Sequence, residues 1–174
     1  MVLPTYNEYD NLADLVRQIL TIGIVTYVIV VDDNSPDGTG KLADALARNN
    51  GQVRVIHRSG KLGLGTAYIA GFRLALAENA DRVVTMDADF SHKPRYLPAV
   101  VNLTKRYHVG IGSRYIAGGG VSRDWGWRRQ LLSRISNCQE WPAQCSAWMS
   151  ATVLPDFGVT GAMCYRESVL PKSK

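Results

Sequence analysis

The chain has 174 residues, of which 46% are hydrophobic and 20% charged, a balance typical of one globular domain with a sizeable core. This composition excludes a disordered or fibrous protein, and the longest apolar run, Ile22–Val31, is too short to cross a bilayer. The net charge of +5 favours anionic partners such as phosphates, nucleic acid or an acidic membrane surface, without selecting among them.

The chain start and the cysteines both indicate a reducing compartment. Met1–Glu8 contains no basic stretch followed by an apolar one, so we expect no secretory signal. Cys138, Cys145 and Cys164 form no C-x-x-C pair, and their odd number leaves one thiol unpaired in any disulfide scheme. We therefore expect reduced thiols and a cytoplasmic location.

The first part of the chain alternates predicted strands and helices. Runs rich in β-branched residues predict strands over Tyr27–Val31 and Val53–His57, and the spacing of apolar residues predicts a helix over Asn11–Leu20. A second helical face is formed by Leu42, Ala43, Leu46 and Ala47. Val2 and Leu3 are expected to form the tail of a first strand. The resulting β-α-β-α-β order is typical of an α/β fold with a mostly parallel sheet.

A glycine-punctuated loop, Arg58–Thr66, leads into the next predicted helix. The loop matches neither a dinucleotide fingerprint, because Tyr68 stands at the third glycine position, nor a phosphate-binding P-loop, because the G-K-[ST] ending is absent. We expect it to pack beneath the rim of a site or to approach phosphate through Lys61. The residues expected to face inward on the helix are Ala67, Ile69, Ala70, Leu74 and Leu76.

A short apolar strand that runs into two carboxylates is the strongest local signal. Val83, Val84 and Met86 predict a buried strand, and Asp87 and Asp89 follow at its carboxyl end. Two Asp residues separated by one position lie on the same side of an extended chain and suit a hard cation such as Mg²⁺ or Mn²⁺. The alternative is a solvated Asp-Ala-Asp turn.

Two further strand ends carry charged residues. Asp33 follows the strand predicted over Tyr27–Val31, and Arg114 ends a strand predicted over Val109–Tyr115, after a helix over Arg95–Tyr107. Because ligands of open α/β sheets bind outside the carboxyl ends of the strands, these groups are expected to meet the Asp pair at one edge. A divalent ion held by the Asp pair would neutralise a diphosphate, Arg114 would contact phosphate, and Asp33 would accept hydrogen bonds from base or ribose. The pattern predicts group transfer from a nucleoside diphosphate donor.

A segment rich in tryptophan and arginine follows a flexible link, Gly118–Gly120. Aromatic and basic residues at close spacing suit a membrane surface and its phosphates, although a solvated helix with packed tryptophans fits equally well. The residues concerned are Trp125, Trp127, Arg128, Arg129 and Arg134. Cys138–Gly158 shows no clear period, and we predict no element there.

Five motifs then follow in order, at Leu3–Glu8, Val31–Thr39, Leu62–Tyr68, Met86–His92 and Gly112–Tyr115. With these motifs the chain resembles the dolichyl-phosphate (polyprenol monophosphate) mannose synthases of the family 2 glycosyltransferases, from Val2 to Asn137. The resemblance implies a GT-A (Rossmann-like) fold and the inverting transfer of mannose from GDP-mannose to a polyprenyl (dolichyl) phosphate. It also implies a Mg²⁺ or Mn²⁺ cofactor and a role in protein glycosylation.

The resemblance also implies the roles of individual residues. Those implied to bind the nucleotide sugar are Pro4, Tyr6, Glu8, Val31, Asp33, Asp87, Ala88, Asp89 and Arg114. Asp87, Asp89 and Ser91 are implied at the metal, and Asp89 and Arg114 as the catalytic residues. The residues implied at the acceptor phosphate or the membrane are Arg114, Arg128, Arg129 and Arg134.

The same resemblance implies a location and partners. The chain is expected to associate peripherally with the cytoplasmic face of a membrane, that of the endoplasmic reticulum in a eukaryote or the plasma membrane in a prokaryote. A membrane-anchoring subunit is an expected partner, and nucleic acid is not.

Family members continue beyond the position of Lys174, so the chain is expected to be C-terminally truncated relative to the family. We expect a GT-A core over residues 1–137 and a divergent, truncated part over residues 138–174. Two alternatives stay open: a non-catalytic subunit that binds a nucleotide sugar or a lipid phosphate, and a polyprenyl-phosphate glucosyltransferase that uses UDP-glucose.

Overall fold

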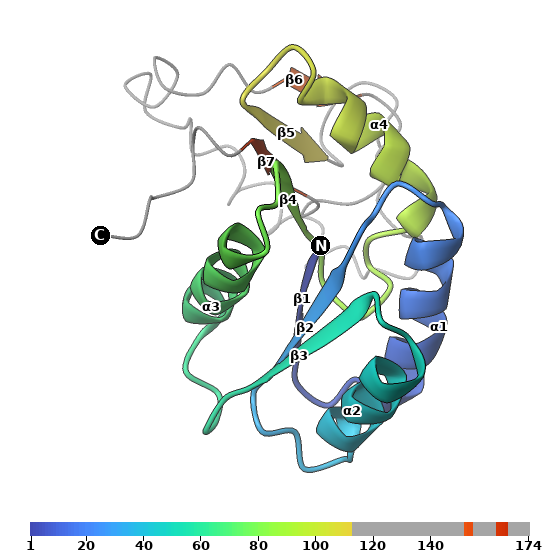
Figure 1. The fold of residues 1–174 in the computed structure, drawn as a ribbon, viewed down its shortest axis with the longest axis vertical. Helices are drawn as coiled ribbons and strands as arrows, with labels where there is room; N and C mark the ends of the chain where they lie inside the picture. The colour runs from blue at the N-terminus through green and yellow to red at the C-terminus, as the bar shows by residue number, and fades with distance from the viewer. Residues whose placement is uncertain (113–151, 155–162, 167–174) are drawn as a thin grey trace, which may run out of the picture.

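The computed structural model describes residues 1–112, 152–154 and 163–166, which form an α/β fold (Figure 1). The helices are α1 (Tyr9–Thr21), α2 (Thr39–Asn49), α3 (Leu64–Ala77) and α4 (Leu97–Leu103), with a short 3-10 helix, η1 (Pro94–Tyr96), before α4. The strands are β1 (Val2–Thr5), β2 (Val28–Asp32), β3 (Val53–His57), β4 (Arg82–Thr85), β5 (Val109–Gly112), β6 (Thr152–Leu154) and β7 (Met163–Arg166). None of the helices in these ranges is both long enough and apolar enough to span a bilayer.

The strands form one sheet in the order β3-β2-β1-β4-β7-β5-β6. β1 pairs in parallel with β2 on one side and with β4 on the other, and β3 extends the parallel part beyond β2. β7 runs antiparallel to its neighbours β4 and β5, whereas β5 and β6 pair in parallel. The predicted mostly parallel sheet is confirmed, and the carboxyl ends of β1 to β4 therefore lie at the same edge.

Helices cover both faces of this sheet (Figure 1). On one face, α1, α2 and α4 pack over strand residues that include Leu3, Val30 and Val84. On the other, α3 packs over the alternating set that includes Val2 and Val31. Because successive strand residues point to opposite faces, continuous apolar strands supply both cores at once. Burial on both faces leaves the strand ends as the place for polar groups.

Two predicted elements differ from the observed ones. The helix predicted over Arg95–Tyr107 is shorter: η1 precedes α4, which begins at Leu97 with Pro98 in its first turn, where a missing N–H is tolerated. The inward orientation predicted for Ile69 is wrong, because its exposed fraction is 50%. Gly71 and Ala75 are buried on α3 instead, since the helix lies too close to the sheet for large side chains.

The closest approach of α3 to the sheet is at Gly71. A Cβ atom built on Gly71 would lie 2.3 Å from Cγ1 and 2.9 Å from Cγ2 of Val2, which is fully buried in β1. Only a glycine allows the helix backbone to lie this close to the strand. Gly71 therefore sets the position of α3, and of the residues at its amino end, relative to β1.

We predict that Gly71→Ala destabilises the chain by about 1–3 kcal/mol, because the added methyl group overpacks a filled site. The free energy of unfolding, measured by urea denaturation, checks this. Gly65→Ala is the matched control, because it lies on the same helix and its Cβ would have nothing within 4 Å. Equal stability of the two variants would contradict the close packing described here.

Candidate functional site

Two loops at the carboxyl edge of the sheet are tied together by hydrogen bonds. After β1, the backbone N–H of Asn7 donates to Ser35 Oγ at 3.1 Å, and that of Glu8 donates to Thr39 Oγ1 at 2.9 Å. The N–H of Tyr9 donates to Asp37 Oδ2 at 3.1 Å. The loop after β1 is thus bound to the loop after β2, which makes one continuous surface of two predicted motifs.

Two acids of the Val31–Thr39 motif hold the loop after β2 in its conformation. Asp32 is buried and accepts hydrogen bonds from the hydroxyl groups of Thr5 and Ser35 and from the Ser35 backbone, at 3.3, 2.5 and 3.2 Å respectively. Asp37 accepts from the Thr39 backbone and hydroxyl at 2.9 and 2.6 Å at the start of α2. Desolvation works to raise the pKa of Asp37, but the hydrogen bonds from Thr39 and Tyr9 outweigh it and lower that pKa.

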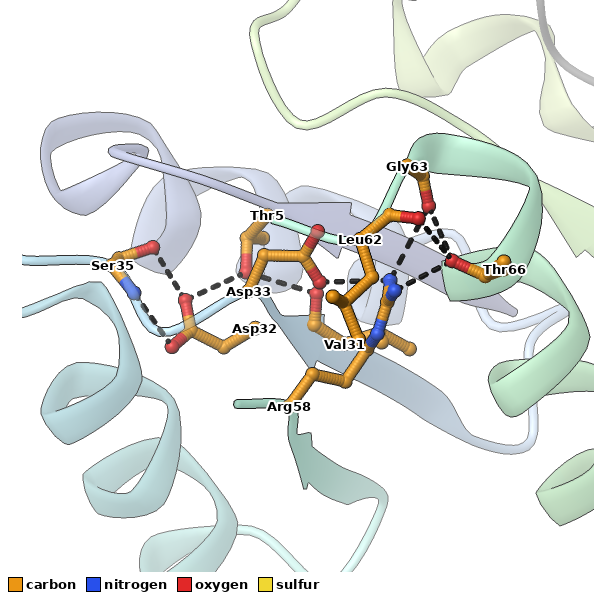
Figure 2. A network of polar contacts seen from close by, with 9 residues as sticks. All are labelled: Thr5, Val31, Asp32, Asp33, Ser35, Arg58, Leu62, Gly63 and Thr66. Carbon is orange, nitrogen blue, oxygen red and sulfur yellow. Dashed lines mark hydrogen bonds and ion pairs between the residues drawn. The ribbon is translucent and has the colours of Figure 1, made fainter. Parts of the chain in front are cut away.

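Asp33 forms a buried ion pair with Arg58 (Figure 2). Asp33 Oδ1 lies 2.8 Å from Arg58 Nη1, and the exposed fractions of the two side chains are 9% and 8%. The N–H is not aligned for a hydrogen bond, and within the described ranges this oxygen accepts no aligned hydrogen bond. Asp33 Oδ1 is itself buried, and its charge is balanced by the guanidinium group of Arg58.

Arg58 also contacts the amino end of α3. Its Nη2 donates to Thr66 Oγ1 at 2.6 Å and its Nη1 to the Gly63 carbonyl at 3.4 Å, as Figure 2 shows. Sequence reasoning assigned no role to Arg58. A signal was present, because Asp32 and His57 are paired in register on adjacent parallel strands, and Asp33 and Arg58 are the residues that follow them.

The other residues predicted to bind the nucleoside differ in their exposure and in their contacts. Tyr6 is 39% exposed and has Lys61 Nζ 4.5 Å from its ring centroid, a cation–π contact. Glu8 is half-buried and accepts from Asn11 Nδ2 at 2.8 Å. Val31 is fully buried and pairs in register with Pro4. The side chain of Val31 packs in the core against α3, and the whole residue presents no exposed surface at this edge.

The acidic pair follows β4 at the same edge. Asp87 has a half-exposed side chain, Asp89 is exposed, and Ala88 between them is buried. Asp89 Oδ1 accepts from the Ser91 backbone N–H at 2.9 Å. Desolvation works to raise the pKa of Asp89, but the Ser91 hydroxyl and backbone, with nearby His92, outweigh it and lower that pKa.

A strained turn places these acids. Phe90 has φ of 57°, in the left-handed region that a bulky residue rarely adopts. The turn is fixed by His92, which is 3% exposed and whose Nδ1 accepts from the Asp87 backbone N–H at 3.1 Å. Backbone strain of this kind persists where the surrounding structure imposes it, often at functional sites.

Tyr68 of α3 contacts one of these acids, Asp87. Its hydroxyl group donates to Asp87 Oδ1 at 3.2 Å. Sequence reasoning placed Tyr68 in a motif but gave it no role, because the pattern of a helix does not show which residue reaches a loop that follows another strand. The amino end of α3 thus contacts both acidic positions, Asp33 through Arg58 and Asp87 through Tyr68.

Asp87 and Asp89 fit a divalent cation that a substrate helps to coordinate. The described residues contain no group of three or more His, Cys, Asp or Glu side chains able to hold a metal ion by themselves. Mg²⁺ and Mn²⁺ are commonly held by one or two carboxylates together with waters and substrate phosphates, so two acids are enough for this class of site. Ser91, next to them, offers a hydroxyl oxygen.

The remaining predicted site residues lie outside the described ranges. These are Arg114, predicted at the phosphate, and Arg128, Arg129 and Arg134, predicted at the acceptor or the membrane. The strand that leads toward Arg114 is described up to Gly112. The roles of all four arginines stay predictions.

Solved structures share the fold. The mannosyltransferase PcManGT from Pyrobaculum calidifontis, solved with GDP-Man and Mn²⁺, matches with a TM-score of 0.60 and 19% identity, over 91% of this chain and 55% of that one. Mannosyl-3-phosphoglycerate synthase from Rubrobacter xylanophilus matches with a TM-score of 0.62 and 19% identity, over 95% of this chain and 51% of that one. The fold is the predicted GT-A type.

The model of the family described as "Glycosyl transferase family 2" matches residues 1–153, and the chain belongs to this family. It is 40% identical over 174 residues to a polyprenol monophosphomannose synthase of Mycolicibacterium smegmatis, covering 99% of this chain and 63% of that protein. It is 42% identical over 132 residues to an undecaprenyl-phosphate mannosyltransferase of Micrococcus luteus, covering 76% of this chain and 54% of that protein. The chain therefore spans less than two thirds of the length of either relative.

We predict that Arg58→Met destabilises the chain by about 3–5 kcal/mol, because it leaves the buried Asp33 carboxylate without its cation. Urea denaturation gives the free energy of unfolding. The double variant Asp33→Asn with Arg58→Met should recover part of the loss, because no buried charge remains. Arg17→Met is the control: it breaks an exposed ion pair with Asp14 and should leave stability close to that of the parent. A loss no larger than that of the control would contradict the assigned burial of the pair.

Proposed function

We propose that the chain transfers mannose from GDP-mannose to a polyprenyl phosphate with the help of a divalent cation. The observation that carries the proposal is the pair Asp87 and Asp89 at the carboxyl edge of the sheet, together with the 40% identity over 99% of the chain to a polyprenol monophosphomannose synthase. The Mn²⁺ and GDP-Man bound to the mannosyltransferase from Pyrobaculum calidifontis support the same donor and the same type of cation.

The donor would lie across the loops that follow β1, β2 and β4. Asp33, held by Arg58 at the carboxyl edge of the sheet, would bind the nucleoside. Tyr6, exposed at the same edge, would line the same pocket. Asp87 and Asp89 would hold the cation at the diphosphate, with Ser91 beside them. When bound, the cation neutralises the diphosphate and stabilises the charge that develops as GDP leaves.

The transfer needs one bond to form and one to break. An oxygen of the lipid phosphate forms a bond to the anomeric carbon of mannose, while the bond from that carbon to the β-phosphate oxygen breaks and its electron pair leaves with GDP. In-line attack inverts the configuration of that carbon. The phosphate oxygen is ionised near neutral pH, so the chain's residues need only orient it. Arg114 and the arginines Arg128, Arg129 and Arg134 are proposed for that role.

A lipid phosphate acceptor would bring the chain to the cytoplasmic face of a membrane. The net charge of +5 supports this location, because an acidic surface attracts a basic protein. A membrane-anchoring subunit would act at the same face. The boundary between a core over residues 1–137 and a divergent part over residues 138–174 is likewise part of the proposal.

Transfer of radiolabelled mannose from GDP-mannose to polyprenyl phosphate, with Mn²⁺ present, tests the proposed function directly. We expect a labelled lipid product that is lost when the cation is chelated. Transfer of glucose from UDP-glucose in its place would favour the glucosyltransferase alternative. Cation-dependent binding of GDP-mannose without any lipid product would favour a non-catalytic binding subunit.

We predict that Asp89→Asn weakens Mn²⁺-dependent binding of GDP-mannose by a few kcal/mol (roughly 2–3), because it removes a charged ligand of the cation. Calorimetric titration with GDP-mannose in the presence of Mn²⁺ measures this. Asp81→Asn is the matched control, since Asp81 is exposed just before β4, at the opposite end of that strand. An affinity equal to that of the parent would reject Asp89 as a ligand.

A further inference from the structure

We infer that Tyr68 is a positioning residue for the cation site, acting through the carboxylate of Asp87. The inference rests on the proposed function, because it assumes that Asp87 binds the cation. Its starting point is the hydrogen bond from the Tyr68 hydroxyl to Asp87 Oδ1, at 3.2 Å, which joins α3 to the loop after β4.

Tyr68 is itself held in place. It is half-buried in the second turn of α3, and its ring stacks on that of Phe72 with 6.3 Å between the ring centroids and 22° between the ring planes. The two residues are four positions apart, so they are neighbours on one side of the helix. Gly71, packed against Val2, fixes the helix on the sheet. The hydroxyl group therefore presents a donor at a defined place.

Asp87 is held from its backbone by a different residue. Its N–H donates to Nδ1 of the buried His92 at 3.1 Å, which fixes where the main chain lies. Asp87 Oδ2 is 3.9 Å from the same nitrogen, too far for a hydrogen bond. Within the described ranges, the hydrogen bond that the carboxylate accepts from a side chain is the one from Tyr68. His92 thus positions the backbone of Asp87, and Tyr68 selects the orientation of its side chain.

The hydrogen bond leaves the carboxylate able to bind a cation. A carboxylate oxygen has two lone pairs, so Oδ1 can accept from Tyr68 and still contact a metal, and Oδ2 stays available. Groups that hydrogen-bond to metal ligands keep them in their binding orientation, and their loss typically costs about 10–100-fold in metal affinity. Tyr68 stands in this relation to Asp87.

The amino end of α3 also contacts Asp33, through Arg58. Arg58 is not proposed to take part in cation binding. Thr66 and Gly63 contact the guanidinium group at one position, and Tyr68 contacts Asp87 at another. The Leu62–Tyr68 motif, part of a segment expected to pack beneath the rim of a site or to approach phosphate through Lys61, would then orient two acids of one site. The role of Tyr68 can be separated from that of Arg58, because only Tyr68 contacts the acid proposed at the cation.

The test measures Mn²⁺ binding to the full chain by electron paramagnetic resonance, with GDP present, for the parent and for Tyr68→Phe. We expect the variant to bind Mn²⁺ about tenfold more weakly or worse, while its melting temperature and its affinity for GDP without the metal stay at the parent values. Tyr27→Phe is the matched control, because it removes a hydroxyl group just before β2, at the opposite end of the sheet. It should bind Mn²⁺ as the parent does.

A second comparison shows whether Tyr68 acts through Asp87. In an Asp87→Asn background, adding Tyr68→Phe should produce no further loss of Mn²⁺ affinity, since the group that Tyr68 positions is already altered. An additional loss of the same size in that background would overturn the inference. So would a Tyr68→Phe affinity within about twofold of the parent, well short of the loss expected for such a partner. A parent chain that binds no Mn²⁺ with GDP would instead refute the proposed cation-dependent function, and the inference with it.

Discussion

The parallel pairing of β1 with both β2 and β4 is the constraint on which the site depends. Thr5 pairs with Asp32 across β1 and β2, and Val2 pairs with Thr85 across β1 and β4. The three strands point the same way, so the loops that follow them leave the sheet at one edge although they are far apart in the sequence. Hydrogen bonds from the loop after β1 to the loop after β2 then join two of them. Site residues are brought together by strand order before any ligand arrives.

The position of α3 adds a second constraint, which comes from packing. Gly71 lies against Val2, so the helix is held close to β1, the strand between the two acidic loops. Its amino end reaches Asp33 through Arg58 on one side and Asp87 through Tyr68 on the other. A larger residue in place of Gly71 would hold α3 farther from the sheet, and the contacts of its amino end with Arg58 and Asp87 would be displaced. The packing of a core glycine and the geometry of the polar edge are therefore linked.

The fold followed from the sequence more completely than the site did. Apolar period and β-branched runs predicted the order of elements, because burial on one or both faces leaves a regular pattern. They failed at Ile69, where the closeness of α3 to the sheet favours Gly71 and Ala75 inward, a property of the packing and not of the period. The acids were found because they end apolar strands. Arg58 and Tyr68 were missed as contacts of those acids, since their roles depend on which strands are neighbours and how the helix lies.

The acids at this edge differ in their electrostatic surroundings. Asp33 is buried beside Arg58, so the pair presents almost no net charge. Asp87 and Asp89 are more exposed, and within the described ranges neither forms an ion pair with a lysine or an arginine. Their hydrogen bonds come from the neutral hydroxyl of Tyr68 and from Ser91. A nucleoside is uncharged, whereas a divalent cation carries two positive charges, so the compensated acid suits the nucleoside and the uncompensated pair suits the cation that accompanies the diphosphate. The direction in which the donor is proposed to lie, nucleoside toward β2 and diphosphate toward β4, follows from this difference in charge.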